Sequence, residues 1–130
     1  MIKKKKGSII NISSVYGIVS PDQKIYVKKK SSRNFIKGPA YPTAKAGMIN
    51  FSRYLASYWG KKGVRVNSVS IGGIENNQDI SFIRKYSSKT ALGRMARTSD
   101  IVGIIKFLCT DESSYITGSN IVVDGGLTAI

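Results

Sequence analysis

The segment Ser8-Ile9-Ile10-Asn11-Ile12 is short, apolar and β-branched, which is typical of a strand buried in a parallel sheet. Two further runs, Val64-Arg65-Val66-Asn67-Ser68-Val69 and Asn120-Ile121-Val122-Val123, predict a second and a third strand. Helical segments separate the strands, and this order predicts right-handed crossovers and a parallel sheet. Three such strands with two or three helices make half of a doubly wound α/β sheet. The 130 residues support at most one domain, 1–130.

The helix after the first strand is predicted over residues 42–58, with Pro42 at its first position. An apolar stripe at the helical period is formed by Ala44, Met48, Phe51, Leu55 and Tyr58. A short helix is expected near residues 81–88, and another over residues 99–108. The last is apolar on most sides, so we expect it to be largely buried, with Cys109 in the core at its end.

Basic residues concentrate in the first part of the chain. The net charge is +14, and residues 1–37 hold ten Lys or Arg against Asp22 alone. Two lysine clusters, 3–6 and 28–30, would suit a patch that follows phosphates. The aromatic residues near them are too few for base stacking, so we expect solvated surface and not a nucleic-acid site. Residues 17–40 combine Gly, Pro, Ser and Lys and predict a basic loop of about two dozen residues.

Composition excludes several kinds of site. The chain has no His and one Cys, which excludes His- or Cys-based metal sites, an internal disulfide and a His-based catalytic triad. No apolar run approaches the ~20 residues that span a bilayer, and no signal-peptide core follows the Lys-rich start. We expect a cytoplasmic protein without a membrane segment.

Three residues form a candidate acid–base set that needs no His. Tyr41 and Lys45 are four residues apart at the start of a helix, so their side chains share a face. Ser14 follows the first strand, at the edge where ligands gather in parallel sheets. A lysine ammonium stabilises a nearby tyrosinate, which can exchange a proton with a hydroxyl or carbonyl oxygen that the serine holds. The same Tyr-x-x-x-Lys spacing also occurs in ordinary surface pairs, and it does not by itself separate the two interpretations.

The order of motifs resembles the C-terminal half of a short-chain dehydrogenase/reductase over nearly the whole chain. Residues 9–17 resemble the strand that ends in the family's catalytic serine, here Ser14, and Tyr41-Pro42-Thr43-Ala44-Lys45-Ala46-Gly47 resembles its Y-x-x-x-K helix. The remaining matches are residues 64–67, 71–74, 93–95, 107–108, 115–118 and 123–126, in the family's order.

The resemblance implies a partial Rossmann-like fold and an NAD(P)-dependent oxidoreductase acting on an alcohol or carbonyl carbon. Ser14, Tyr41 and Lys45 would be catalytic. Tyr41 and Lys45 would also contact NAD or NADP, together with the backbone of Gly72, Gly73 and Ile74. The substrate would be a small molecule, sugar-derived if the likeness to bacterial surface-sugar and flagellin-modification enzymes holds. Members of the family usually form homo-oligomers.

The sequence also departs from the family. It contains no Gly-rich loop of the kind that seats a pyrophosphate, so the cofactor-binding βαβ unit is expected to be lacking. Ile71 replaces the usual proline, and Ser14 and Tyr41 lie 27 residues apart, about twice the family's gap, so residues 17–40 form an insertion. Two interpretations stay open, a catalytic fragment and a non-catalytic remnant; a basic nucleic-acid-binding protein is less favoured.

Overall fold

The sheet is three-stranded and parallel in the computed structural model, which describes residues 1–27 and 36–130. Its strands are β1 (Gly7–Ser14), β2 (Val64–Ile71) and β3 (Asn120–Val123), in the order β1-β2-β3. The register sets the end of β1 beside the end of β2, with Ser14 opposite Ile71. The predicted parallel α/β sheet is confirmed, and β1 and β2 each extend two residues further toward their carboxyl ends than predicted.

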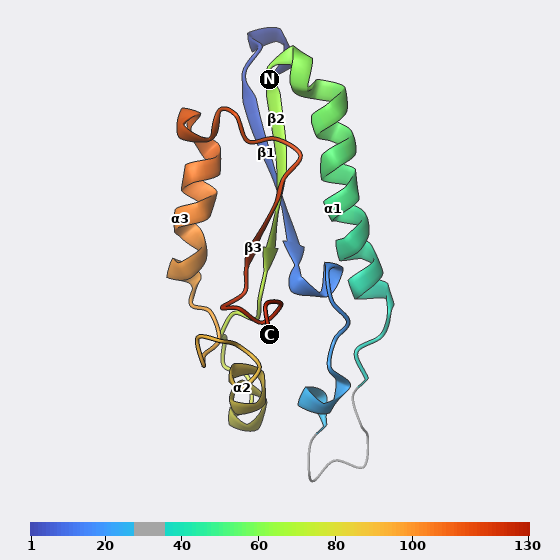
Figure 1. The fold of residues 1–130 in the computed structure, drawn as a ribbon, viewed down its shortest axis with the longest axis vertical. Helices are drawn as coiled ribbons and strands as arrows, with labels where there is room; N and C mark the ends of the chain where they lie inside the picture. The colour runs from blue at the N-terminus through green and yellow to red at the C-terminus, as the bar shows by residue number, and fades with distance from the viewer. Residues whose placement is uncertain (28–35) are drawn as a thin grey trace.

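Helices cover both faces of this sheet (Figure 1). α1 (Ala40–Trp59) lies against one face and α3 (Thr98–Cys109) against the other, while α2 (Ile80–Ser87) lies beyond the carboxyl ends of the strands. Short 3₁₀ turns occur at Ile2–Lys4, Val15–Gly17, Gln23–Tyr26, Gly60–Lys62 and Asp111–Ser113. Within the described parts of the chain, no helix combines the length and apolar character needed to cross a membrane.

β2 lies in the centre of the sheet and is the most deeply buried strand. Its apolar side chains Val64 and Val66 pack with Ala56 of α1. Its polar side chains are paired, because a buried polar group without a partner is costly. Asn67 donates to the Ile116 carbonyl at 2.9 Å and accepts from a backbone N–H, while Ser68 and Ser70 both donate to Asn120 at the start of β3. These bonds fix β3 and the turn before it.

α1 buries a different face from the one that its apolar stripe predicts. The buried residues are Ile49, Ser52 and Ala56, whereas Phe51 and Tyr58 are more than half exposed. The small side chains at positions 52 and 56 allow the helix to approach the sheet closely. The stripe is divided between core and surface, because its Leu55 packs against the buried cluster of Ala56, Val64 and Val66.

A polar bond between β1 and α1 accompanies this orientation. Asn11 of β1 donates to the Ser52 hydroxyl at 2.9 Å, and Ser52 donates in turn to the Met48 carbonyl at 2.9 Å. A helix that turned its apolar stripe toward the sheet would leave the Asn11 amide without this partner. The helix also begins earlier than expected, at Ala40, which places Pro42 at the third helical position.

α3 is less buried than its apolar composition predicts. Only Ile101 and Leu108 are buried, Val102 is 42% exposed, and Cys109 is exposed. α3 packs against β1 and the turn Asp111–Ser113, and its other faces meet solvent. The prediction of a largely buried helix with a core cysteine is wrong, because composition does not reveal how many neighbours a helix has.

Candidate active site

Ser14, Tyr41 and Lys45 line one cavity of about 350 Å³ at the carboxyl ends of β1 and β2. Ser14 ends β1, and the other two residues lie in the first turns of α1, on the side of the sheet that α1 covers. The 27-residue separation in sequence is thus closed in the fold. The structure brings the predicted catalytic residues together, while their chemical roles stay predictions.

The end of β1 and the turn after it contact α1 closely at Lys45. The Ser13 hydroxyl donates to the Lys45 carbonyl at 2.8 Å. Gly17, in the turn after β1, lies so near that a side-chain carbon at this position would be 2.8 Å from the Lys45 carbonyl carbon. The Lys45 ammonium reaches back and donates to the Ile12 carbonyl at 2.8 Å. Strand and helix are therefore locked together at the point where the site forms.

The predicted catalytic hydroxyls differ in exposure. Ser14 is buried, and its oxygen accepts from the Tyr16 N–H at 3.2 Å, which caps the turn Val15–Gly17. Tyr41 is 42% exposed and lies in the first turn of α1. The Lys45 ammonium lies 5.7 Å from the centre of the Tyr41 ring. Tyr41 is therefore accessible to a ligand, whereas Ser14 is buried and its hydroxyl is positioned by the Tyr16 N–H.

The turn Gly72–Ile74 forms another wall of the same cavity and leaves two backbone groups unused. Gly72 donates to the Val123 carbonyl at 2.9 Å, and Gly73 donates to the Tyr86 hydroxyl at 2.5 Å and accepts from Ala96 at 2.9 Å. The Gly72 carbonyl and the Ile74 N–H have no hydrogen-bond partner in residues 1–27 and 36–130. One acceptor and one donor are thus available to a carboxamide.

Both glycines of this turn are required by packing. A side-chain carbon on Gly72 would lie 2.9 Å from the Asp124 backbone, and one on Gly73 would lie 2.8 Å from both Met95 and Tyr86. The backbone therefore approaches its neighbours more closely than any other residue type allows. The predicted cofactor-contacting residues thus line the cavity without the usual proline, and Ile71 occupies the last position of β2.

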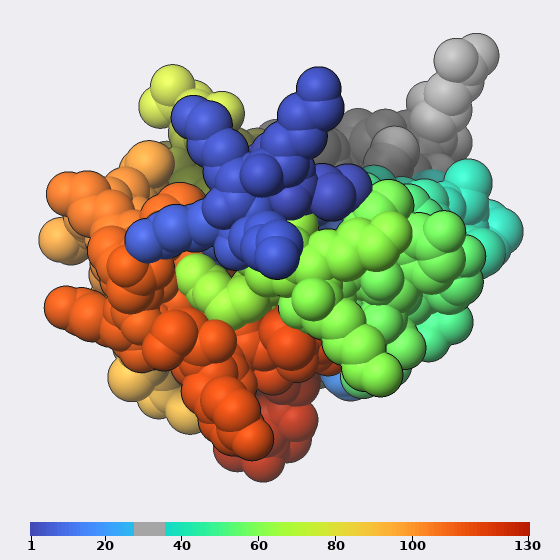
Figure 2. Space-filling model, turned by 90° about the horizontal axis from the view of Figure 1, so that it is seen from above, coloured from blue at the N-terminus to red at the C-terminus, as the bar shows by residue number. Residues whose placement is uncertain are grey.

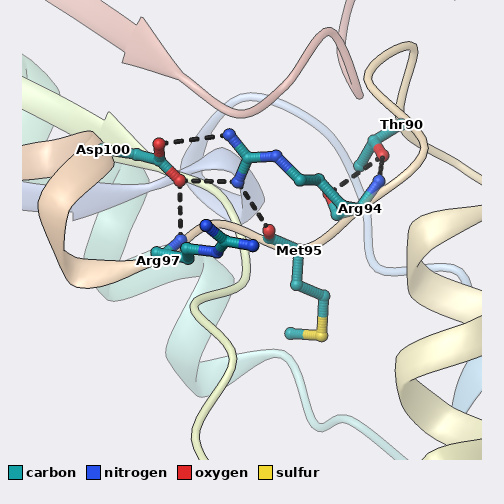
Figure 3. A network of polar contacts seen from close by, with 5 residues as sticks. All are labelled: Thr90, Arg94, Met95, Arg97 and Asp100. Atoms are coloured by element: carbon teal, nitrogen blue, oxygen red, sulfur yellow. Dashed lines mark hydrogen bonds and ion pairs between the residues drawn. The ribbon is translucent and has the colours of Figure 1, made fainter.

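The ion pair between Arg94 and Asp100 fixes the segment that packs against this turn (Figure 3). Arg94 binds both oxygens of Asp100 at 2.6 and 3.1 Å and also donates to the Met95 carbonyl. The Arg97 N–H donates to the same carboxylate at 2.7 Å, so Arg97 is the N-cap of α3 and the helix begins at Thr98, one residue before the predicted start. Arg94 first, and then this N–H, lower the pKa of Asp100 from 3.8 to about 2.

The cluster matters for the site because it fixes the segment Met95–Ala96. Thr90 closes it on the other side, donating to the Arg94 carbonyl and accepting from the Arg94 N–H, both at 3.1 Å (Figure 3). Met95 is buried against Tyr86, and Ala96 forms a parallel bridge with Ile74. Sequence reasoning quoted residues 93–95 without a role, since nothing local to them indicates the contact with residues 72–74.

Residues from the described part of the insertion complete the cavity. Tyr26 and Lys37 line it, together with Tyr16 next to the serine. Tyr26 donates to the Tyr16 hydroxyl at 2.9 Å, and its ring packs against Phe82 of α2 with centroids 5.5 Å apart. The sequence patterns do not indicate that Tyr26 and Lys37 line a site. They lie in a segment with no periodic pattern, and only its basic character was visible.

The same segment is built into the fold and is not a structureless loop where it is described. Ile25 is buried in a cluster with Tyr86 and Met95. Lys85 of α2 donates to the Val27 carbonyl at 2.6 Å, and Lys89 forms an ion pair with Asp22 at 2.8 Å. Residues 17–27 contain no helix or strand apart from short 3₁₀ turns, so the loop over 17–40 stays a prediction, and the lysine cluster 28–30 lies outside the described residues.

Three tyrosines around the cavity, one buried and two half-buried, keep their protons. Burial is the main cause that raises the pKa of Tyr16, Tyr26 and Tyr86 above the ordinary value of 10.0. Their hydroxyls therefore act as neutral hydrogen-bond groups. The more exposed Tyr41 is the tyrosine of this wall that combines access to the cavity with two nearby lysines, Lys45 and Lys37.

Comparison with known proteins gives consistent matches over nearly the whole chain. A family profile described as Enoyl-(Acyl carrier protein) reductase matches residues 1–128. The post-translational flagellin modification protein A of Campylobacter coli is 35% identical over 124 residues, which are 95% of this chain and 47% of that protein. A 3-oxoacyl-(acyl-carrier-protein) reductase of Thermotoga maritima is 36% identical over 132 residues, covering 98% of this chain and 48% of the relative.

A solved structure is similar in both sequence and shape. The short chain dehydrogenase from Leptospira borgpetersenii, with bound NAD+, is 43% identical with a TM-score of 0.87, covering 98% of this chain and 47% of that one. The chain spans about half the length of the curated relatives it matches. The flagellin-modification relative is one of several with similar identity, so the finer subfamily prediction stays a prediction.

Proposed function

The chain belongs to the short-chain dehydrogenase/reductase family, and on that premise we propose that residues 1–130 form the catalytic part of an NAD(P)-dependent oxidoreductase. The reaction would interconvert an alcohol and a carbonyl compound, and the bound nicotinamide would supply or accept the hydride. The observation that carries the proposal is the meeting of Ser14, Tyr41 and Lys45 in one cavity.

Each of these side chains has a separate role in the proposal. Tyr41 exchanges a proton with the reacting oxygen, because it is the exposed hydroxyl of the set. Lys45, whose ammonium lies 5.7 Å from the centre of the Tyr41 ring, supplies positive charge beside this tyrosine. Ser14 has its hydroxyl hydrogen available, since its oxygen only accepts from Tyr16, and it orients the substrate oxygen.

The residues present fit a nicotinamide. Its carboxamide needs one acceptor and one donor, and the Gly72 carbonyl and the Ile74 N–H are without partners in the described residues. The Lys45 ammonium uses one of its three protons on Ile12 and has two left for ribose hydroxyls. These groups would hold and orient the cofactor. These groups do not include residues that bind the pyrophosphate or select between NAD and NADP.

The proposal extends to the setting of the reaction. The substrate would be a small molecule, and a sugar-derived one rests on the resemblance alone. A cytoplasmic location and a homo-oligomeric state follow from the resemblance in the same way. Because the chain spans about half the length of its relatives, the activity is proposed for the natural polypeptide that contains residues 1–130, with any segment that precedes them.

A matched pair of tyrosine variants tests the proposal. NAD(P)H-dependent turnover of alcohols and carbonyl compounds is measured in that polypeptide and in Tyr41→Phe, which we expect to be slower by about 1000-fold, within the range of general acid–base catalysis. Tyr54→Phe is the control, since Tyr54 lies exposed on the same helix away from the cavity. Full turnover in Tyr41→Phe would overturn the assignment.

A further inference from the structure

The cavity is lined by positive charge without any carboxylate. Lys37 and Lys45 line it, and no Asp or Glu among residues 1–27 and 36–130 does. A second cavity of about 520 Å³ shares Tyr16 and Lys37 with the first, and Lys37 is the charged residue among those that line it. Lys37 therefore lies where the two cavities meet. A ligand that extends from one cavity into the other has to pass this ammonium.

The backbone of Lys37 is held in position by the Gln23 side chain. The Gln23 side chain donates to the Lys37 carbonyl at 3.1 Å and accepts from the Lys37 N–H at 2.9 Å. The Lys37 ammonium lies 4.5 Å from the centre of the Tyr41 ring and 6.0 Å from that of Tyr26, within the range of cation–π attraction. The ammonium is thus directed toward the proposed catalytic tyrosine by contacts on two sides.

The charge of Lys37 is not neutralised within the described residues. Lys6, Lys89 and Arg94 each form an ion pair with an aspartate, but Lys37 forms none with any carboxylate in residues 1–27 and 36–130. Lys45 differs, because its ammonium donates to the Ile12 carbonyl. Lys37 is the cation of this wall that is left for a ligand.

A neutral donor lies on the same wall. Tyr16 lines both cavities, and its oxygen accepts from Tyr26, which leaves the Tyr16 proton without an acceptor among the described residues. An ammonium and a hydroxyl donor in one partly enclosed site are the groups that bind a carboxylate or a phosphate through charge-assisted hydrogen bonds.

We propose that Lys37, assisted by Tyr16, binds an anionic group of the substrate, a carboxylate or a phosphate, and that the site selects anionic substrates. This inference rests on the proposed function, because the anion is taken as part of the molecule that reacts at Tyr41. Lys37 is a specificity-determining residue in this proposal. It binds the part of the substrate that lies away from the reacting carbon, where the two cavities meet.

Calorimetric binding of three small probes to the natural polypeptide that contains residues 1–130 tests it at constant ionic strength. The probes are succinate, its uncharged analogue succinamide, and inorganic phosphate. Succinate or phosphate is expected to bind about tenfold or more tightly than succinamide. Tighter binding of phosphate identifies a phosphate site, and tighter binding of succinate identifies a carboxylate site. Equal binding of succinate and succinamide, or no binding of any probe at millimolar concentration, overturns the proposal.

Variants identify the responsible cation. Lys37→Gln is expected to remove the preference for the anion, Lys37→Arg to retain it, and Lys24→Gln to leave it unchanged, since the exposed Lys24 is on the same segment but lines neither cavity. An unchanged preference in Lys37→Gln would overturn the proposal even if that variant is fully folded.

A fourth variant separates this inference from the proposed function. Tyr41→Phe removes the proton exchange but keeps the ring beside Lys37, so its affinity for succinate or phosphate is expected to equal that of the wild type. Lys37-dependent binding in a protein with no turnover would support the anion site and count against the oxidoreductase. Turnover that depends on Tyr41 with equal preference for an acid and its amide would do the reverse.

Discussion

Two regions of the molecule meet at the cavity, and they are built differently. In the first, Ser14 ends β1 and Lys45 lies in the first turns of α1. Ser13 and Gly17 both contact the backbone of α1 and hold these two elements together. In the second, the turn Gln23–Tyr26 and α2 are joined by side chains of Lys85, Lys89 and Ile25. The proposed chemistry lies on the first region and the proposed selectivity on the second.

The difference teaches why the two regions tolerate change differently. A contact between a strand and a helix backbone has no rotamer freedom, so any displacement moves a reacting group directly. Side chains that join a turn to α2 can adjust or be lost one at a time, and each loss weakens the wall without moving Lys45. Substitutions in the first region should therefore affect turnover, and those in the second should affect stability and ligand preference.

Among substitutions that test the contacts of these two regions, the largest effect is expected at Gly17, and its absence would contradict the comparison. In Gly17→Ala the new carbon would lie 2.8 Å from the Lys45 carbonyl carbon and 2.9 Å from the Ala46 nitrogen. Because both are backbone atoms, α1 has to shift, and we expect turnover to fall by about 100-fold. The assay is the one used for Tyr41→Phe.

Gly47→Ala is the matched control for that substitution. Gly47 lies on α1, and a carbon added there would meet no atom of the described residues within 4 Å. Turnover is expected to be unchanged, and the helix to be slightly more stable, by about 0.5–1 kcal/mol. Equal turnover in Gly17→Ala and Gly47→Ala would show that the β1–α1 contact does not set the site.

An intermediate effect is expected in the second region. Ile25 is 6% exposed and packs against Tyr86 and Met95, so Ile25→Ala leaves a cavity in this cluster. We expect the free energy of unfolding to fall by about 2 kcal/mol, measured by urea denaturation. Ile36 is 70% exposed, and Ile36→Ala should change the free energy of unfolding by less than about 0.5 kcal/mol. No difference between the two variants would mean that the insertion is only attached to the surface.

The smallest effect is expected at Asp100, which supports the turn that both regions share. Its pKa in the folded protein, about 2, is below its ordinary value of 3.8, because Arg94 and the Arg97 N–H bind the ionised form. The stabilisation is therefore complete above about pH 4 and is lost as the pH falls toward 2. The melting temperature of Asp100→Asn should be below that of the wild type at pH 6, and the gap should narrow on acidification. A gap in Glu112→Gln of the same size would show that any acidic residue has this effect.

The elements could be predicted from the sequence because their signals are local. The β-branched runs at 8–12, 64–69 and 120–123 all lie within observed strands, and the helices begin and end near the expected residues. The buried face of α1 could not be predicted, because the helix meets the sheet through Ile49, Ser52 and Ala56, and the partner of Ser52, Asn11, lies in a distant strand. The burial of α3 depends on its neighbours, which composition does not describe.

The candidate site divides in the same way. Ser14, Tyr41, Lys45 and the turn Gly72–Ile74 could be found from spacing and motif order. Tyr26, Lys37 and the pair Arg94–Asp100 could not, because their partners lie in segments without periodicity and far away in the sequence.

By itself the sequence determined the parallel α/β arrangement and the identity of the proposed catalytic set. The strands and helices depend on local patterns that local backbone preferences are sufficient to express, whereas the catalytic set was identified by the resemblance in motif order along the chain. Only the tertiary structure decided that Lys37 faces Tyr41, that Ile25 is in the core and that α1 exposes its aromatic side chains. These outcomes depend on which surfaces meet when distant segments pack, and that is a property of the whole fold.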